Sequence, residues 1–338
     1  VPILVMPMGY PRDQMHVFPN FNSALNFRNV TKWCEPITTP ESVGAVMRRA
    51  FTQLRTGRGG PVLVEVPFDL VGTELAEPID YRPAPAVSCG PDPQDIERVA
   101  RLLIEAERPV IYAGQGVHYA RAWSELRRLA ELLSIPVTTS LQGKSAFPEN
   151  HPLALGSGGR TMPRAVHEFL HDADVIFGIG CSFTSTLFGV RMPTGKTIIQ
   201  ATLDPRDLNK DVPIQAAVLG DARLTLSALI DAVGTGPHKL ADARRDAVPG
   251  RIRDIKSAWL DEWRPKLTAD DTPLCPYRVI WDLMQTVDVA KTIITHDAGS
   301  PRDQLSPFWR RGAPRSNTGR GATTPPRGGP GPAAGAKP

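Results

Sequence analysis

The sequence has few cysteines, no long apolar run and no broad excess of one charge. Its 338 residues include four cysteines, Cys34, Cys89, Cys181 and Cys275, which lie far apart and form no Cys-x-x-Cys pair. This spacing excludes a disulfide framework and a zinc ribbon, and it fits a reducing, cytoplasmic location. No apolar stretch approaches the roughly 20 residues that span a bilayer, so we expect no membrane segment.

The small positive charge of the sequence comes from its C-terminal end. The sequence has 39 basic and 35 acidic residues, and five of the basic residues lie in residues 311–338, which have no acidic residue. The rest of the chain is close to neutral, whereas nucleic-acid binding depends on many Lys and Arg contacts to phosphate, so we expect no nucleic-acid partner. The same 28 residues contain seven Gly and six Pro. This composition predicts a disordered or degraded tail.

The length predicts about two domains or more, and the hydrophobic patterns predict an α/β organisation. Residues 39–57 have a helical apolar stripe between a Thr cap and a terminal Gly, and a buried strand follows at residues 61–66. Residues 1–75 therefore resemble the closing part of a parallel α/β unit. Several prolines in residues 76–91 indicate a linker.

Residues 92–233 are predicted to form a complete domain. Its expected strands, at residues 110–113, 136–140, 175–180 and 197–203, are separated by helical patterns. This alternation is typical of a parallel, doubly wound sheet. A second linker is expected at residues 234–272, and residues 273–310 begin a third α/β unit. The predicted fold class is α/β, with parallel doubly wound sheets and a central Rossmann-like domain flanked by partial α/β domains.

One motif has the spacing of a zinc hydrolase. His167, Glu168 and His171 form a His-Glu-x-x-His pattern on a predicted helix, which would place two imidazoles on one face. A third ligand is missing, since no Glu occurs between Glu168 and Glu262. An ordinary surface helix is the better interpretation, and a zinc site ranks behind the other hypotheses.

A cluster of small and polar residues is expected at the carboxyl ends of the central strands. The turn Gly114-Gln115-Gly116 follows a strand, but the complete dinucleotide fingerprint fails because Tyr119 occupies its third glycine position. Two interpretations remain open, a nucleotide or FAD site and a set of tight turns. The candidate residues are Gly114, Gln115, Gly116, Thr139, Ser140, Leu141, Gly180 and Asp204.

The order of segments resembles the thiamine diphosphate enzymes of the acetolactate synthase-like family. The resemblance extends to about residue 310 and rests on residues 30–67, on 108–116, on the run from Ile135 to Leu153, and on Ile294-Thr-His-Asp-Ala-Gly299. It implies that residues 1–75 are the C-terminal part of a pyrimidine-binding domain. Residues 92–233 would then be the central domain, and residues 273–310 the start of a diphosphate-binding domain.

The resemblance also implies a chemistry and its cofactors. Members use thiamine diphosphate and magnesium to decarboxylate or join 2-keto acids, and a homodimer or homotetramer is expected. The diphosphate turn would be Asp297, Ala298, Gly299 and Ser300, and Lys32 would lie near substrate entry. The family's catalytic glutamate would precede Val1, and its Gly-Asp-Gly metal motif does not occur. We therefore expect this chain to be inactive alone and to bind thiamine diphosphate weakly or not at all.

FAD is a further cofactor of some members of that family. They hold it with a Gly-Val-Arg-Phe-Asp-Asp-Arg segment, where this chain has Gly180-Cys-Ser-Phe-Thr-Ser-Thr186. Loss of both arginines and both acids makes FAD possible rather than expected. The alternative to an enzyme is a non-catalytic nucleotide-binding or scaffold protein built on the central domain. Whether the chain is truncated or a full gene product stays open at this point.

Overall fold

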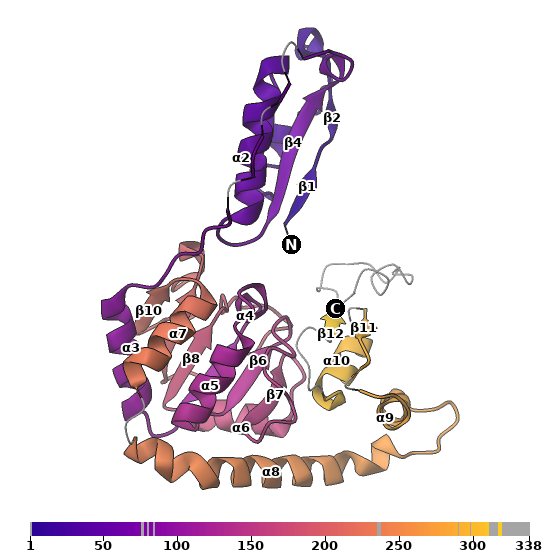
Figure 1. Cartoon of the computed structure of the whole chain (residues 1–338). Coiled ribbons are helices and arrows are strands. Elements are labelled where there is room, and N and C mark those ends of the chain that lie inside the picture. The colour runs from indigo at the N-terminus through magenta and orange to yellow at the C-terminus, as the bar shows by residue number, and fades with distance from the viewer. Residues whose placement is uncertain are drawn as a thin grey trace. The chain divides into compact units, whose positions relative to one another are not determined.

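The structure is a computed structural model that describes residues 2–75, 78–79, 81–83, 85–234, 238–289, 291–297, 299–310 and 317–319. The chain divides into two compact units, Val1–Cys89 and Gly90–Pro338, each of which has its own core (Figure 1).

The first unit is a small parallel sheet with one covering helix. Strand β4 (Pro61–Pro67) pairs with β1 (Ile3–Val5) and β2 (Met8–Gly9) on one side and with β3 (Trp33–Pro36) on the other. Helix α2 (Val43–Arg55) packs its buried residues Val46 and Ala50 in one cluster with Val62 and Val64 of β4. A one-turn helix α1 (Ser23–Asn26) and 3-10 turns at Arg12–Gln14, Pro40–Ser42 and Phe68–Leu70 complete it. The predicted Thr39 cap forms, since its side chain accepts a hydrogen bond from the Ser42 N–H.

The second unit contains a sheet of six parallel strands in the order β10-β9-β8-β5-β6-β7. Starting from β5, successive strands are added first on one side and then on the other, so the order reverses between β5 and β8. This is the doubly wound arrangement that the sequence predicts, and it places a topological switch point beyond the carboxyl ends of those two strands. The strands are β5 (Val110–Ala113), β6 (Val137–Ser140), β7 (Ala154–Gly158), β8 (Val175–Ile179), β9 (Thr197–Thr202) and β10 (Ala216–Leu219).

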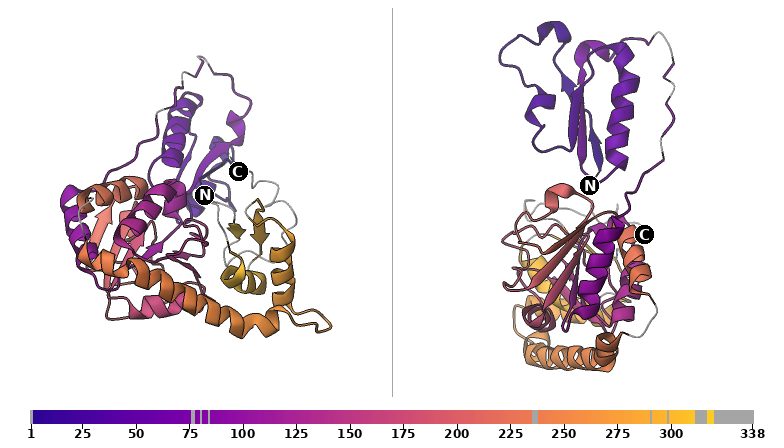
Figure 2. Two further views of the ribbon diagram at one scale, coloured as in Figure 1. Left: turned by 60° about the horizontal axis from the view of Figure 1, so that its bottom comes forward. Right: turned by 90° about the vertical axis from the view of Figure 1, so that its left-hand side faces the viewer.

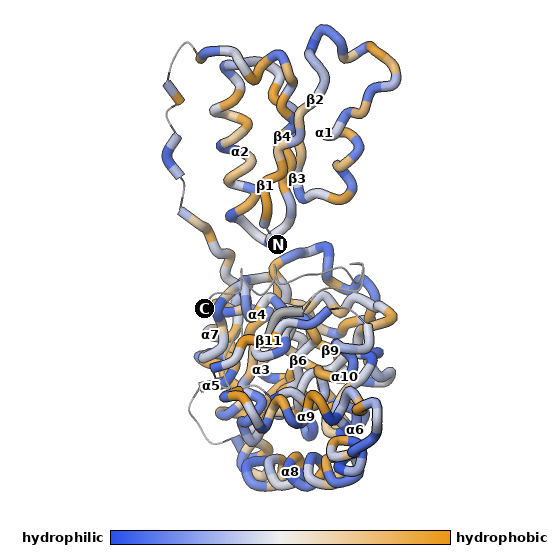
Figure 3. The backbone as a smooth tube through the Cα atoms, turned by 90° about the vertical axis from the view of Figure 1, so that its right-hand side faces the viewer, coloured by the Kyte–Doolittle hydropathy of each residue, from blue (hydrophilic) through white to orange (hydrophobic). Residues whose placement is uncertain are grey.

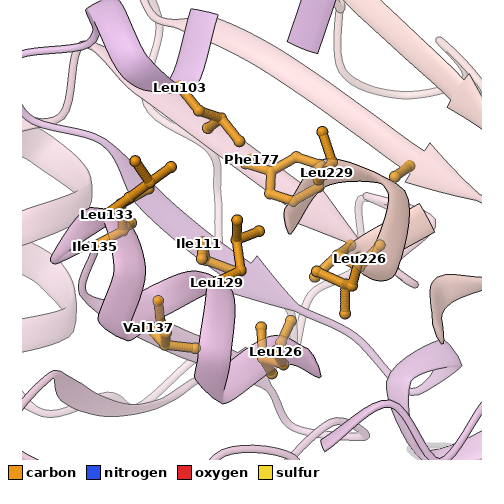
Figure 4. Packing of buried hydrophobic residues seen from close by; sticks show 14 of the residues in the cluster. Leu103, Ile111, Leu126, Leu129, Leu133, Ile135, Val137, Phe177, Leu226 and Leu229 are labelled. Atoms are coloured by element: carbon orange, nitrogen blue, oxygen red, sulfur yellow. The ribbon is translucent and has the colours of Figure 1, made fainter. Parts of the chain in front are cut away.

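Helices cover both faces of this sheet (Figures 1 and 2). Ile111 of β5 belongs to a core cluster with Leu126, Leu129 and Leu226, which come from the helices on one face (Figure 4). The neighbouring residue Val110 belongs to the cluster on the opposite face. Because side chains alternate along the strand, β5 contributes residues to the hydrophobic cores on both faces of the sheet. The helices of the first face are α3 (Pro93–Glu105), α4 (Gly116–Tyr119), α5 (Trp123–Leu133) and α7 (Ala222–Val233), and α6 (Arg164–Asp172) covers the other.

The segment predicted as a second linker contains α8 (Lys239–Leu267), one long helix that is mostly hydrophilic in Figure 3. After it come α9 (Pro276–Thr286), β11 (Ile294–His296), α10 (Ser300–Phe308) and β12 (Asn317–Gly319). Helix α8 contacts α6, and α10 contacts the edge strand β7. None of the helices in the described ranges is long and apolar enough to cross a membrane.

Candidate functional site

The glycines at the switch point bring two loops into backbone contact. A Cβ atom added to Gly114 would lie 2.3 Å from the carbonyl oxygen of Gly180 and 2.6 Å from Cα of Cys181. One added to Gly116 would lie 2.6 Å from Cα of Gly180, whose own φ is +60°. Both positions therefore need glycine because the loop after β5 and the loop after β8 touch there.

The amides of this turn are used inside the domain. The N–H of Gly114 donates to the Ile179 carbonyl at 2.9 Å, and that of Gly116 donates to the Gly180 carbonyl at 2.8 Å. The N–H of Gly180 donates to Ala201 at 2.8 Å. Gln115, between the two glycines, is exposed. Close packing of the two loops is thus enough to explain why glycine occupies these positions, and no ligand is needed for that explanation.

The polar residues after β6 are also engaged within the domain. Thr139 Oγ1 and Ser157 Oγ are 2.9 Å apart and buried, and Ser140 Oγ accepts a hydrogen bond from the Gly143 N–H at 3.0 Å. The side chain of Leu141 lies against Gly159, where an added Cβ would be 2.9 Å from it. These residues join β6 to the strand and loop beside it.

Asp204 caps a turn after β9. Its buried carboxylate accepts hydrogen bonds from the backbone N–H of Arg206 at 3.1 Å and from its guanidinium, with Nη2 at 2.8 Å. It therefore begins the 3-10 turn Pro205–Asp207. The structure places Asp204 at the same edge of the sheet as Gly180, since both residues follow neighbouring parallel strands.

The loop that corresponds to the flavin segment folds back on the sheet. Phe183, at φ +46°, stacks on Tyr112 with ring centroids 5.7 Å apart, and its ring would be 2.3 Å from a Cβ on Gly178. Burial raises the pKa of the neighbouring Cys181 thiol to about 12. Farther along the loop, Thr184 accepts a hydrogen bond from Lys210 at 2.8 Å. Residues 180–186 of this loop have no arginine or acid, so the segment itself offers no charged side chain to a flavin dinucleotide.

The His-Glu-x-x-His pattern lies on α6, facing a cation of α8. Arg251 Nη2 is 2.6 Å from Asp172 and 3.8 Å from Glu168. The rings of His167 and His171 are stacked with centroids 6.3 Å apart. In the ranges that the structure describes, no group of three His, Cys, Asp or Glu side chains is placed to hold a metal ion.

Lys32 lies in the first unit, where its ammonium contacts the end of α2. Its Nζ atom donates to the carbonyl of Gln53 at 2.6 Å and also to that of Thr56. A lysine in this place satisfies the last carbonyls of a helix and complements the negative end of the helix dipole. The geometry thus gives Lys32 a helix-capping contact.

The turn from Asp297 to Ser300 connects β11 to α10, and Ala298 within it lies outside the described residues. Gly299 precedes the helix at φ +86° and ψ −146°, a conformation that is essentially confined to glycine. Ser300 begins the nine-residue helix α10. The N–H groups of Ser300 and Arg302 lack partners within the helix, the arrangement that suits an anion, whereas Pro301 between them has no N–H.

A buried ion pair connects α10 to the central sheet. The sequence analysis missed this pair. Lys144 Nζ is 2.6 Å from Glu149 Oε1 and donates to the Ser306 carbonyl of α10 at 3.1 Å. Ser157 donates to the same Glu149 oxygen at 3.1 Å. Lys144 and Glu149 both belong to the run 135–153 used for the family resemblance, which was the signal available in the sequence.

Charged residues of both signs lie near the turn. Arg302 of α10 is buried, with its guanidinium 4.6 Å from the ring centroid of Phe188. The pKa of His296 is lowered, first by burial and then by the charges of Arg302 and Lys144. Arg302 is paired with Asp303 at 2.8 Å and Lys144 with Glu149 at 2.6 Å, and Asp297 opposes the lowering of the His296 pKa, so the charges around this end of α10 are largely balanced.

The second unit matches a known family over most of its central sheet. Residues 96–229 match the thiamine pyrophosphate enzyme central domain. A probable acetolactate synthase large subunit of Methanocaldococcus jannaschii is 35% identical over 306 residues, which are 86% of this chain and 50% of that protein. A glyoxylate carboligase of Escherichia coli O157:H7 is 32% identical over 237 residues, or 68% of this chain and 40% of that protein.

A solved structure shares the fold. The crystal structure of benzoylformate decarboxylase from Polynucleobacter necessarius superposes with a TM-score of 0.71 at 20% sequence identity, covering 94% of this chain and 57% of that one. At this identity the likeness concerns the fold. The chain spans about half the length of the curated relatives that it matches.

Proposed function

Because the chain belongs to the thiamine diphosphate-dependent, acetolactate synthase-like family of enzymes, we propose that it is part of an enzyme that acts on 2-keto acids by decarboxylation or carboligation. The observation that carries this proposal is the 35% identity over 306 residues to an acetolactate synthase subunit. The relatives are named for reactions of 2-oxo compounds but for different substrates. We therefore propose only the class of substrate, the 2-keto acids.

The chain's contribution to the cofactor site is the turn that begins α10. When bound, thiamine diphosphate supplies the carbon nucleophile that attacks a 2-keto acid. We propose that the N–H groups at the start of α10 bind its diphosphate, because Gly299 leaves open space beside the turn. The Lys144–Glu149 pair holds α10 from its other end, through Ser306. Lys32 would act by fixing the end of α2 rather than by touching substrate.

The part of the chain that the structure describes has no ligand set for magnesium. The sequence contains no Gly-Asp-Gly, and the described residues contain no three-residue cluster that could hold a metal ion. The residues thus do not fit a magnesium site, and a diphosphate bound without a divalent cation keeps its charge poorly compensated. We therefore propose that the 338 residues alone bind thiamine diphosphate weakly or not at all.

The domain assignment is proposed on the same relationship. Residues 1–75 would be the C-terminal part of a pyrimidine-binding domain, 92–233 the central domain and 273–310 the start of a diphosphate-binding domain. The separate cores of the two compact units support the division near residues 76–91. A homodimer or homotetramer and a cytoplasmic location complete the proposal.

The test compares the 338-residue chain with the product of the complete open reading frame. Both proteins are incubated with a panel of 2-keto acids, with and without thiamine diphosphate and magnesium, and carbon dioxide and 2-keto acid consumption are measured. We expect cofactor-dependent consumption by the complete product and none by the 338 residues. A complete product that binds thiamine diphosphate but consumes no 2-keto acid would refute the proposed activity.

A further inference from the structure

A small cavity lies where α8 and the segment after α10 meet β7. It has a volume of about 30 Å³, and its lining includes Glu149, Lys256, Trp259, Trp309 and Arg310. A cavity needs about 10–15 Å³ to hold one water molecule, so a cavity of this volume can hold a molecule of only a few atoms. A neighbouring cavity of about 120 Å³ shares Trp259, Pro307 and Arg310 with it.

Positive charge exceeds negative charge around this cavity. Lys256 and Arg310 line it, and the carboxylate in its lining, Glu149, is already paired with Lys144 at 2.6 Å. One further anion would therefore be stabilised by the surrounding cations. Two tryptophans belong to the lining, Trp309, which is buried, and Trp259, which is half-buried, whereas Arg310 is exposed.

Lys256 is the nucleophilic group in this lining. Its Nζ atom donates a hydrogen bond to the Ala154 carbonyl of β7. Burial, and then the charge of Arg310, lower the pKa of Lys256 to about 8, while Glu149 opposes and Lys144 adds to that shift. A substantial share of the amine is thus neutral and nucleophilic slightly above neutral pH.

We propose that Lys256 is a site of reversible carbamylation by dissolved carbon dioxide. The lone pair of the neutral Nζ attacks the carbon of CO₂, so that an N–C bond forms and one C–O π bond breaks. The nitrogen loses a proton to water, and the product is a carbamate anion. The nitrogen keeps one N–H, which can still donate to Ala154.

Size and charge both favour this reactant over larger acyl donors. Carbon dioxide has three atoms and fits a cavity that a 2-keto acid would overfill. The reaction replaces a cation with an anion in a lining that has an excess of cations, which removes the repulsion among Lys256, Arg310 and Lys144. Dissolved carbon dioxide is present in any aerated buffer, so the inference does not depend on the proposed enzyme activity.

The experiment is carbon-13 NMR of the 338-residue chain in ¹³C-labelled bicarbonate between pH 7 and pH 9. Besides the resonance of the α-amino carbamate, we expect a carbamate resonance that grows as the pH rises through the pKa of Lys256 and that is lost in Lys256→Met. The control variant Lys239→Met, on the exposed start of the same helix, should retain the resonance.

A second measurement does not require a variant to fold. The wild-type carbamate is trapped with an ethylating reagent, and peptide mass spectrometry locates the modified lysine. A trapped carboxyl group on Lys256 supports the proposal. Absence of any resonance in the folded wild-type chain, or trapping confined to exposed lysines, would overturn it.

Discussion

The buried pair of Lys144 and Glu149 gives the sharpest stability prediction. Its side chains are 2% and 7% exposed with their charges 2.6 Å apart. Lys144→Met removes the cation from beside the buried Glu149 carboxylate, which keeps the hydrogen bond from the Ser157 hydroxyl, and it removes the donor to Ser306. Breaking a buried pair from one side costs about 3–5 kcal/mol. For a unit of this size, that corresponds to a fall in melting temperature of roughly 6–20 °C.

A double variant separates two contributions to the lost stability: the loss of the ion pair itself, and the free-energy cost of leaving one charge buried without its partner. Lys144→Met with Glu149→Leu removes both charges, so we expect stability to recover to within about 2 kcal/mol of wild type. Urea unfolding is followed by tryptophan fluorescence, because five of the six tryptophans lie in the second unit. Arg98→Met, which breaks a surface pair, is the control and should cost less than about 1 kcal/mol. Equal losses in the single and double variants would refute this reasoning.

Three further predictions concern the same unit. Gly114→Ala should destabilise it by about 1–3 kcal/mol, since a Cβ there meets backbone at 2.3 Å, whereas Gly90→Ala, in open space, should be nearly neutral in the same urea assay. Asp221→Ala should cost about 1 kcal/mol and speed amide exchange at the start of α7, because its side chain caps that helix; unchanged exchange would count against the cap. Between about pH 8 and pH 10.5 the unfolded chain binds more protons at Lys256 than the folded one, so stability should rise with pH by at most about 1.4 kcal/mol per unit. Lys256→Met should remove that rise, and an identical slope in both proteins would contradict the burial of this ammonium.

The central fold could be predicted from the sequence because its strands and helices have strong periodicity. Strand β5 was predicted with the bounds that the structure shows, Val110–Ala113. Strands β7 and β10 were not among the expected strands, and β7 contains Gly156 and Gly158. Glycine within a strand weakens its propensity, and here neighbouring strands override it.

The full length of helix α8 could not be predicted because its sequence lacks a regular apolar stripe. It contains Pro249 and Pro265, and its buried residues, Ala241, Arg244, Ile252 and Leu267, do not form a regular stripe. Arg244 bonds the Ala106 and Leu133 carbonyls at 2.8 Å, a contact between distant segments that no local pattern reveals. The Lys144–Glu149 pair was missed for a related reason, since charged residues usually lie at the surface.

The most direct measurement of the central claim is the affinity of thiamine diphosphate for the complete gene product and for its Gly299→Ala variant, by calorimetric titration with magnesium. Gly299 has a backbone conformation that alanine does not adopt without strain, so the substitution should distort the proposed diphosphate turn. We predict at least about tenfold weaker binding, or roughly 1.4 kcal/mol, beside a loss of about 1–3 kcal/mol in stability from the strained turn in the absence of cofactor. Equal affinities, or no binding by the complete product, would contradict the assignment of this turn.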